Sequence, residues 1–265
     1  PKALVIFAHG FGAGHQAYTT EINALAEAGY WVLAYDATGC VASDGARLYG
    51  FDQGVLDLRS AIRYANEEPR FSKMKKILVG HSWGAFCVMN NVEAEGVCGA
   101  VAMCGFISGA KVLAQNTVGR KVPCLTFLAE AFLRLFNSIR FGKAANFNSL
   151  KSLQKTDKPV YLIYGSSDKT VSFRGNGAIF AKKFAESSNI TCKICEGKAH
   201  NPYLTMDAER AMNQTFSEIA KQRKKNPVRA LQMYKEIDYA KIMEEDSEVM
   251  RSIAEYCDRL ADKKC

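Results

Sequence analysis

The sequence alternates between short apolar runs and segments with helical periodicity, and this alternation limits the possible folds more than any other feature. The apolar runs are nearly continuous, as expected for strands of a parallel sheet that helices cover on both faces. The intervening segments carry apolar residues three and four positions apart, which is typical of amphipathic helices. The pattern predicts an α/β fold, a mostly parallel central sheet flanked by helices. The expected strands are residues 3–8, 31–35, 76–80, 99–104, 160–164 and 191–195, and the expected helices are residues 18–28, 53–66, 85–93, 175–187, 203–223 and 246–260.

The alternation breaks once, after Gly105, where about 50 residues pass before the next expected strand. Residues 107–155 include the Leu- and Phe-rich stretch AFLRLFNSIRF, which is too apolar for a plain loop. We therefore expect a helical insertion over the carboxyl edge of the sheet, within a core of residues 1–106 and 156–265. Residues 203–235 are expected to form an extra helical excursion before a last helix packs back on the sheet.

Composition excludes several classes of protein. With 265 residues, 48% of them hydrophobic, the chain suits one sizeable domain with an insertion. It holds no run of 18 apolar residues, so no stable membrane insertion is expected. The net charge is +8, but the basic residues are dispersed and no nucleic-acid-reading module is recognisable, so no nucleic-acid partner is expected. Whether the protein is a monomer or a homo-oligomer stays open.

The cysteines favour a reducing compartment. Nine cysteines, an odd number without framework spacing, are expected to be reduced thiols in the cytoplasm. The chain starts without a methionine inside an apolar run, so a trimmed start and a removed N-terminal signal stay open. Cys192 and Cys195 form a CxxC pair, but strand residues three apart point to opposite faces, so no metal site is expected there.

The stretch GHSWG, residues 80–84, is the strongest candidate for chemistry. Ser82 follows an expected strand and precedes an expected helix, which is where a nucleophile sits on a strained strand-to-helix turn. Gly80 and Gly84 lack the Cβ atoms that would collide in such a turn. The alternative is a tight turn that merely contains a hydroxyl.

A serine nucleophile needs a base, and the chain has only four histidines. His81 is tied to the turn beside Ser82, His9 is expected to make a structural hydrogen bond, and His15 is expected to face solvent. His200, directly after the last expected strand, remains as the candidate base.

The base needs a carboxylate that orients it, and Asp168 is the candidate. Asp168 follows the expected strand 160–164, in the sequence GSSD, which also suits a simple turn aspartate. The chain order Ser82, Asp168, His200 is the order of the α/β-hydrolase arrangement, and each residue follows a different strand.

The loop HGFGAG, residues 9–14, is expected to supply part of an oxyanion hole. Its glycines, Gly10 among them, let the backbone approach a reacting carbonyl. We expect the backbone N–H groups of Phe11 and Trp83 to be the two donors. The Trp83 indole is also a candidate wall of the acyl pocket. A phosphate-binding glycine loop is disfavoured, because neither GxxxxGK[ST] nor GxGxxG is present.

These motifs together resemble the α/β-hydrolase superfamily, and within it the serine-aminopeptidase and monoacylglycerol-lipase-like branch. The resemblance implies Ser82 as nucleophile, Asp168 as acid, His200 as base and a helical cap over residues 107–155. It departs from the branch at Cys40–Ser43, where the usual D-x-x-G-x-G-x-S is incomplete, and by lacking two N-terminal strands. The motifs that carry it are HGFGAG at 9–14, YDATGCVASDG at 35–45, GHSWG at 80–84, GSSDKTVS at 165–172 and GKAHNP at 197–202.

We therefore expect a serine hydrolase that cleaves small-molecule carboxylic esters through an acyl-enzyme at Ser82, without cofactor or metal. Cap residues suggest recognition of an apolar acyl or aromatic group, unless these side chains only pack the cap on itself. The residues concerned are Leu125, Phe127, Phe132, Leu135 and Phe136.

Several activities use the same parts. An aminopeptidase or amidase would need an acidic residue to bind a free amine, for which Glu130 is the candidate. Thioesterase and acyltransferase activities stay open. Enzymes with an aspartate nucleophile are disfavoured because Ser82 occupies that position. A non-catalytic binding protein of this fold is the alternative from another class, although such proteins generally lose a triad residue.

Overall fold

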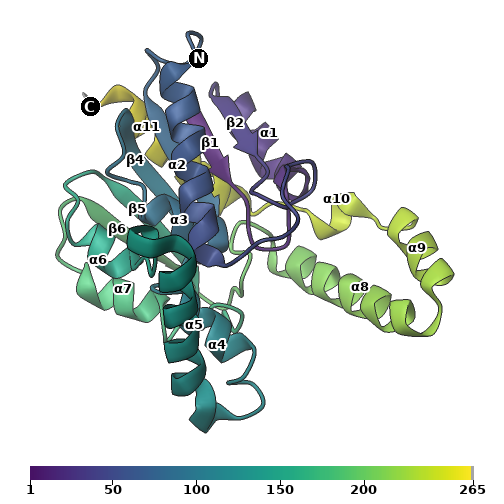
Figure 1. The fold of residues 1–265 in the computed structure, drawn as a ribbon. Coiled ribbons are helices and arrows are strands. Elements are labelled where there is room, and N and C mark those ends of the chain that lie inside the picture. Colours follow the sequence, from purple (N-terminus) through teal and green to yellow (C-terminus); the bar gives the residue numbers. More distant parts are fainter. Residues whose placement is uncertain (264–265) are drawn as a thin grey trace.

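Parallel strands form a six-stranded central sheet in the computed structural model, which describes residues 1–263 (Figure 1). The strand order is β2-β1-β3-β4-β5-β6. The predicted α/β class is confirmed, and each expected strand agrees with an observed one to within two residues. The strands are β1 (Leu4–Ala8), β2 (Trp31–Tyr35), β3 (Lys76–His81), β4 (Val97–Met103), β5 (Val160–Gly165) and β6 (Ile190–Cys195).

Two separate hydrophobic cores cover the two faces of this sheet, which explains the unbroken apolar runs. In β1, Leu4 and Ile6 belong to one core, whereas Val5 and Phe7 belong to the other. Burying successive side chains on opposite faces requires apolar residues at every position. The first core is shared with α2 (Phe51–Glu67), α3 (Trp83–Met89) and α7 (Gly177–Lys183), and the second with α1 (Thr19–Glu27) and α11 (Ser247–Asp262).

The strand order reverses direction between β1 and β3, because β2 lies on one side of β1 and β3 on the other. In open α/β sheets, ligands bind beyond the carboxyl ends of the strands at such a reversal. The loop that begins at His9 leaves β1 there, and Ser82 directly follows β3. The topology therefore places the two strongest sequence motifs side by side.

The insertion between β4 and β5 is helical, and α4 and α5 project together from the body of the protein (Figure 1). The buried Asp52 of α2 anchors it by accepting hydrogen bonds from Asn146 N at 2.6 Å and Asn137 Nδ2 at 3.1 Å. Burial raises the pKa of the Asp52 carboxyl. The elements are α4 (Gly109–Asn116), η2 (Pro123–Leu125), α5 (Thr126–Phe141), η3 (Gly142–Ala144) and α6 (Ser149–Leu153).

Helix α5 leaves a row of large apolar side chains in solvent. Their exposed fractions lie between 41% and 78%, so packing of the insertion on itself does not bury them. No helix within residues 1–263, α5 included, has the length and apolarity to cross a bilayer. The exposed residues at this helix are Leu125, Phe127, Leu128, Phe132, Leu135, Phe136 and Ile139.

A second helical projection, which we call the arm, comprises residues 206–242 and points away from α4 and α5 (Figure 1). It contains α8 (Met206–Lys225), α9 (Pro227–Lys235) and α10 (Tyr239–Ile242), and so extends beyond the expected excursion at 203–235. Its two ends meet in a short antiparallel ladder. Thr205 N donates to Glu244 O at 2.9 Å, and Asp246 N donates to Tyr203 O at 2.7 Å.

Cys192 and Cys195 lie on opposite faces of β6, as expected for strand residues three positions apart. Cys192 packs against one core and Cys195 is buried in the other, so the CxxC pair is split between the two faces of the sheet. Within residues 1–263, the cysteines at 40, 87, 104, 124, 192, 195 and 257 are free. Cys98 is disulfide-bonded, so the expectation of reduced thiols is wrong at this position.

Candidate active site

Ser82 lies on a strained turn between β3 and α3. Its backbone has φ 56° and ψ −113°, a conformation that non-glycine residues rarely adopt. A Cβ atom on Gly84 would lie 1.9 Å from Ala8 O, and one on Gly80 would lie 2.6 Å from the Gly84 backbone. Glycine at both positions therefore lets the turn pack closely against β1 and leaves Ser82 at the start of α3.

The structure brings Ser82, His200 and Asp168 into one hydrogen-bonded row. His200 Nε2 lies 2.9 Å from Ser82 Oγ, and His200 Nδ1 lies 2.8 Å from Asp168 Oδ2. The other carboxylate oxygen of Asp168 accepts the N–H groups of Thr170 at 2.8 Å and Val171 at 3.0 Å. The two sequence interpretations of Asp168 thus hold together: one oxygen shapes the turn while the other orients the imidazole.

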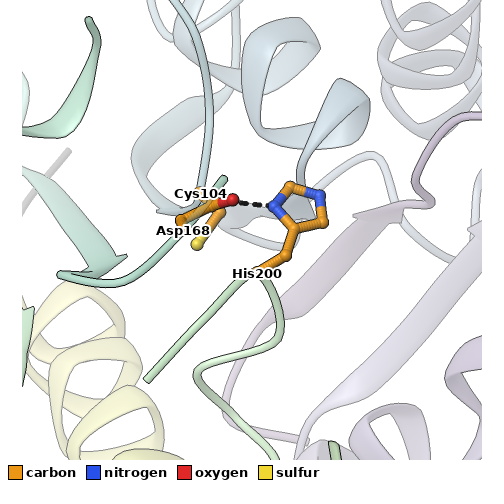
Figure 2. A group of neighbouring side chains, drawn as sticks. All are labelled: Cys104, Asp168 and His200. Atoms are coloured by element: carbon orange, nitrogen blue, oxygen red, sulfur yellow. Dashed lines mark hydrogen bonds and ion pairs between the residues drawn. The ribbon is translucent and has the colours of Figure 1, made fainter. Parts of the chain in front are cut away.

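Cys104 is a neighbour of this row that the sequence did not indicate (Figure 2). The potential ligand atoms of Cys104, Asp168 and His200 all lie within 4.8 Å of one another, close enough to share a metal ion. Burial and the Asp168 carboxylate hold the pKa of the Cys104 thiol well above its usual value, whereas metals bind the thiolate. The ring nitrogens of His200 are also both engaged, so the geometry favours a triad over metal ligation.

The backbone N–H groups of Phe11 and Trp83, the expected oxyanion donors, lie in the loop after β1 and at the start of α3. Trp83 is the first residue of α3, so its N–H has no acceptor within the helix. In the loop after β1, His9 Nδ1 lies 2.8 Å from Gly10 O and donates to it, while His9 Nε2 accepts the N–H of Ala37 at 2.9 Å. Because a peptide unit is planar, holding the Gly10 carbonyl also fixes the direction of the Phe11 N–H.

The Trp83 side chain does not line a pocket. Its indole is 1% exposed and donates from Nε1 to Phe51 O at 2.8 Å. The Phe11 ring is 59% exposed and packs edge-on against Phe51, with ring centroids 5.1 Å apart. The idea that the indole walls an acyl pocket is therefore wrong, and Phe11 presents the accessible aromatic surface instead.

The other histidines differ in role. His9 makes structural hydrogen bonds, as expected. His15 is not simply solvent-facing, because its Nδ1 lies 3.0 Å from Asp36 Oδ1 while its side chain stays partly exposed. His81 points away from Ser82 and is fully buried; burial and then the nearby His200 lower its pKa to about 3.

The neutral His81 links the two halves of the site. Its Nε2 lies 2.8 Å from the His200 carbonyl oxygen and must donate to it. Its Nδ1 then accepts from the Tyr18 hydroxyl at 2.8 Å. The same hydroxyl accepts the Gly10 N–H at 3.0 Å, and a Cβ on Gly10 would lie 2.5 Å from it. Tyr18, which the sequence did not single out, thus connects the Gly10–Phe11 loop to the backbone of His200.

Comparison with known proteins places this site in a family. The model of the serine aminopeptidase family S33 matches residues 1–155. The chain belongs to this family. The matched residues include Ser82 but end before Asp168 and His200, so the structure, not the match, brings the three together.

The chain is also similar to proteins named as a lipase and as esterases. Human (Homo sapiens) monoglyceride lipase is 24% identical over 252 residues, which cover 83% of this chain and 81% of that protein. The esterase Pf2001 of Pyrococcus furiosus has a TM-score of 0.58 at 21% identity, covering 84% of this chain and 82% of that one. Est1E of Butyrivibrio proteoclasticus, solved with ferulic acid bound, has a TM-score of 0.56 at 18% identity and covers 76% and 82%. These structural likenesses show the α/β-hydrolase fold.

In this S33 family member, the arm holds the loop that carries His200. Glu209 of α8 is 5% exposed; its Oε1 accepts the Asn201 N–H at 2.7 Å and Asn201 Nδ2 at 3.0 Å, and its Oε2 accepts the Ala199 N–H at 3.3 Å. Lys198 Nζ donates to Asp246 Oδ2 at 2.5 Å and to Leu204 O at 2.7 Å. The sequence did not indicate Glu209, because nothing in its spacing distinguishes it from the solvated carboxylates of a charged helix.

Glu130, the candidate amine-binding residue, is already paired. Its Oε1 accepts two hydrogen bonds from Arg134, the nearer at 2.7 Å from Nη2, one helical turn along α5. A carboxylate neutralised in this way offers little attraction to a substrate ammonium group.

Proposed function

We propose that the protein is a serine hydrolase that cleaves carboxylic esters through an acyl-enzyme at Ser82. The observation that carries the proposal is the continuous row from Ser82 Oγ to His200 Nε2 at 2.9 Å and from His200 Nδ1 to Asp168 Oδ2 at 2.8 Å. A base within hydrogen-bond reach is what turns a weakly nucleophilic serine hydroxyl into an attacking group.

The proposed reaction has two halves, the acylation of Ser82 and the hydrolysis of the acyl-enzyme. Ser82 Oγ attacks the ester carbonyl carbon as its proton passes to His200 Nε2, and Asp168 stabilises the imidazolium. The Phe11 and Trp83 N–H groups bind the oxyanion, an interaction whose loss typically costs about 3–4 kcal/mol. His200 then protonates the leaving alcohol. In the second half, a water gives its proton to His200 and attacks the acyl group, which releases the acid and restores Ser82.

An apolar acyl or aromatic group is the proposed recognised part of the substrate. The exposed Phe11 ring, packed on Phe51, supports this, as does the row of exposed apolar residues at α5. We also propose that residues 107–155 act as a cap, since the insertion follows β4 at the carboxyl edge that carries Ser82. The relatives, a monoglyceride lipase and an esterase by name, agree with an ester substrate.

Fluorophosphonate labelling tests the nucleophile. The protein should be labelled at Ser82, the Ser82→Ala variant should not, and the Ser72→Ala variant, altered at an exposed serine, should react like the original protein. Labelling that survives in Ser82→Ala, or that is missing in the unaltered protein, would refute the proposal. A panel of nitrophenyl esters of increasing acyl length, run beside aminoacyl nitroanilides, then separates an esterase from an amidase.

A further inference from the structure

A cavity of about 660 Å³ lies between the arm and the loop that follows β1. One wall is the glycine loop Gly12–Gly14, which directly continues from Phe11. The opposite wall is the arm, which contributes Met212 and Phe216 from α8, Ile242 from the end of α10, and Tyr239. The cavity thus has one side formed by the proposed oxyanion loop and the other by the helices that hold the His200 loop.

The lining of this cavity is apolar and carries no charged side chain. Its polar members, Gln16, Thr19 and Thr20, are all neutral. Phe216 and Tyr239 are 40% and 57% exposed, although the Phe216 ring also contacts Tyr234 with ring centroids 6.4 Å apart, so apolar surface of both residues remains accessible at the cavity. Its volume lies in the range of small-molecule sites, about 300–1,000 Å³.

The surface on the other side of α8 is charged, so an uncharged lining is not a property of the whole arm. A hollow of about 690 Å³ there is lined by charged residues, Glu209, Arg210 and Lys221 among them. Helix α8 therefore separates a charged hollow from an uncharged one. A ligand with a charged group would prefer the first, and an uncharged aliphatic ligand the second.

We propose that the cavity between the arm and residues 12–20 binds a single uncharged alkyl chain. Contact with such a chain would remove the exposed faces of Phe216 and Tyr239 from water, which is favourable in proportion to the apolar area buried. The arm lies outside the residues that the family model matches, whereas the opposite wall, residues 12–20, lies within them. The chain has two possible sources: the ester bound at Ser82, or a separate lipid.

Direct binding tests the site without any catalytic step. The protein carrying Ser82→Ala is titrated by calorimetry with non-hydrolysable 1-O-alkylglycerol ethers of 6 to 14 carbons, kept below their critical micelle concentrations. Affinity should rise about three- to fourfold per methylene until the cavity is full, and then level off. Ala240→Trp, which places a large side chain at a lining position, should weaken the longer ethers at least tenfold. Ser217→Trp on the charged side of α8 is the matched control and should leave affinity unchanged.

Photo-crosslinking of the unaltered protein keeps the test independent of whether Ala240→Trp folds. An alkyl diazirine should label peptides that contain residues 12–20, 212–216 or 239–243. Labelling confined to other peptides, or an affinity that does not depend on chain length, would overturn the proposal.

Kinetics then distinguish the two sources of the chain. If the ester's own chain enters, Ala240→Trp should lower kcat/KM for decanoyl esters at least tenfold and leave acetyl esters unchanged. If a separate lipid enters, Ala240→Trp should leave both unchanged, and the alkyl ether should bind together with an acetyl ester rather than compete with it. Because the titration uses Ser82→Ala, a protein that binds alkyl ethers but hydrolyses nothing would refute the proposed function and leave this inference standing.

Discussion

Glu209 Oε1 accepts the backbone N–H of Asn201 at 2.7 Å, and Asn201 directly follows the candidate base His200. Glu209 Oε2 accepts the N–H of Ala199, the residue on the other side of His200, at 3.3 Å. One buried carboxylate from the first turn of the arm therefore accepts hydrogen bonds from the backbone on both sides of His200. We interpret Glu209 as a positioning residue for His200.

Glu209→Gln should lower kcat at least tenfold and leave KM for a small ester nearly unchanged. The amide can still accept from Asn201, but its NH₂ group then meets the Ala199 N–H, so His200 loses its fixed position relative to Ser82. Small displacements of a catalytic group cost rate more than binding. Asp207→Asn, at an exposed position of the same turn, is the control, and steady-state kinetics give both constants. Equal kcat for Glu209→Gln and Asp207→Asn would contradict the assignment.

Gly84→Ala should destabilise the protein by at least about 3 kcal/mol, because a Cβ there would lie 1.9 Å from Ala8 O and the backbone of β1 cannot yield. Gly12→Ala provides a comparison at φ 73° with nothing within 4 Å of the new Cβ. It should cost only the strain of the left-handed conformation, about 1–2 kcal/mol. Urea denaturation measures both, and similar losses at the two positions would argue against the close contact.

Acid should destabilise the fold through His81. Its pKa in the folded protein is about 3, below the usual 6.5, so the unfolded chain takes up a proton first as the pH falls. The stabilising contribution is full above pH 6.5 and is lost toward pH 3, on the order of 5 kcal/mol in all. Urea titrations between pH 7 and pH 4 should show a flatter loss for His81→Gln. A loss of stability as steep in His81→Gln as in the original protein would contradict this role of His81.

Glu21 should make the folded protein less stable as the pH rises, whereas His81 makes it less stable as the pH falls. Burial and then the nearby Glu245 raise its pKa to about 7, and its Oε1 has no hydrogen-bond partner among residues 1–263. The folded protein therefore holds this proton more tightly than the unfolded chain, so stability falls as the pH rises from about 4.5 to 7. Glu21→Gln should raise the free energy of unfolding at pH 8 by about 3 kcal/mol and change little at pH 4. An equal gain in stability for Glu21→Gln at pH 4 and at pH 8 would contradict this prediction.

Cys104 should resist alkylation although it adjoins the candidate site. The raised pKa of its buried thiol leaves almost no thiolate at pH 8, whereas Cys124 is exposed. Iodoacetamide followed by peptide mass spectrometry should modify Cys124 first and leave Cys104 intact in the folded protein. Early modification of Cys104 together with loss of activity would show that the site opens.

Much of the fold could be predicted from the sequence because parallel strands buried on both faces leave a clear signal. The turn at Ser82 was also predictable, since only glycine fits at Gly80 and Gly84, and chain order pointed to Asp168 and His200. These inferences depend on neighbours in sequence or on the order of strands, which the sequence contains directly.

The residues that position the site were not predictable in the same way. Tyr18 and Glu209 act through hydrogen bonds to backbone groups of residues 10, 199 and 201, and a backbone group has the same chemistry at every position. The exposed state of Phe127 and Phe132 was likewise hidden, because an amphipathic pattern shows that a helix has an apolar face but not what covers it.

The ladder at the base of the arm brings Thr205 and Glu244 together, so the arm leaves and rejoins the body at almost one point. A segment attached in this way can lengthen, shorten or be exchanged between homologues without altering the register of any strand. Its first turn is different, because removing Glu209 would leave the partly buried N–H groups of Ala199 and Asn201 without this acceptor. Among related chains, we therefore expect the distal arm to vary freely while the acidic position at its root persists.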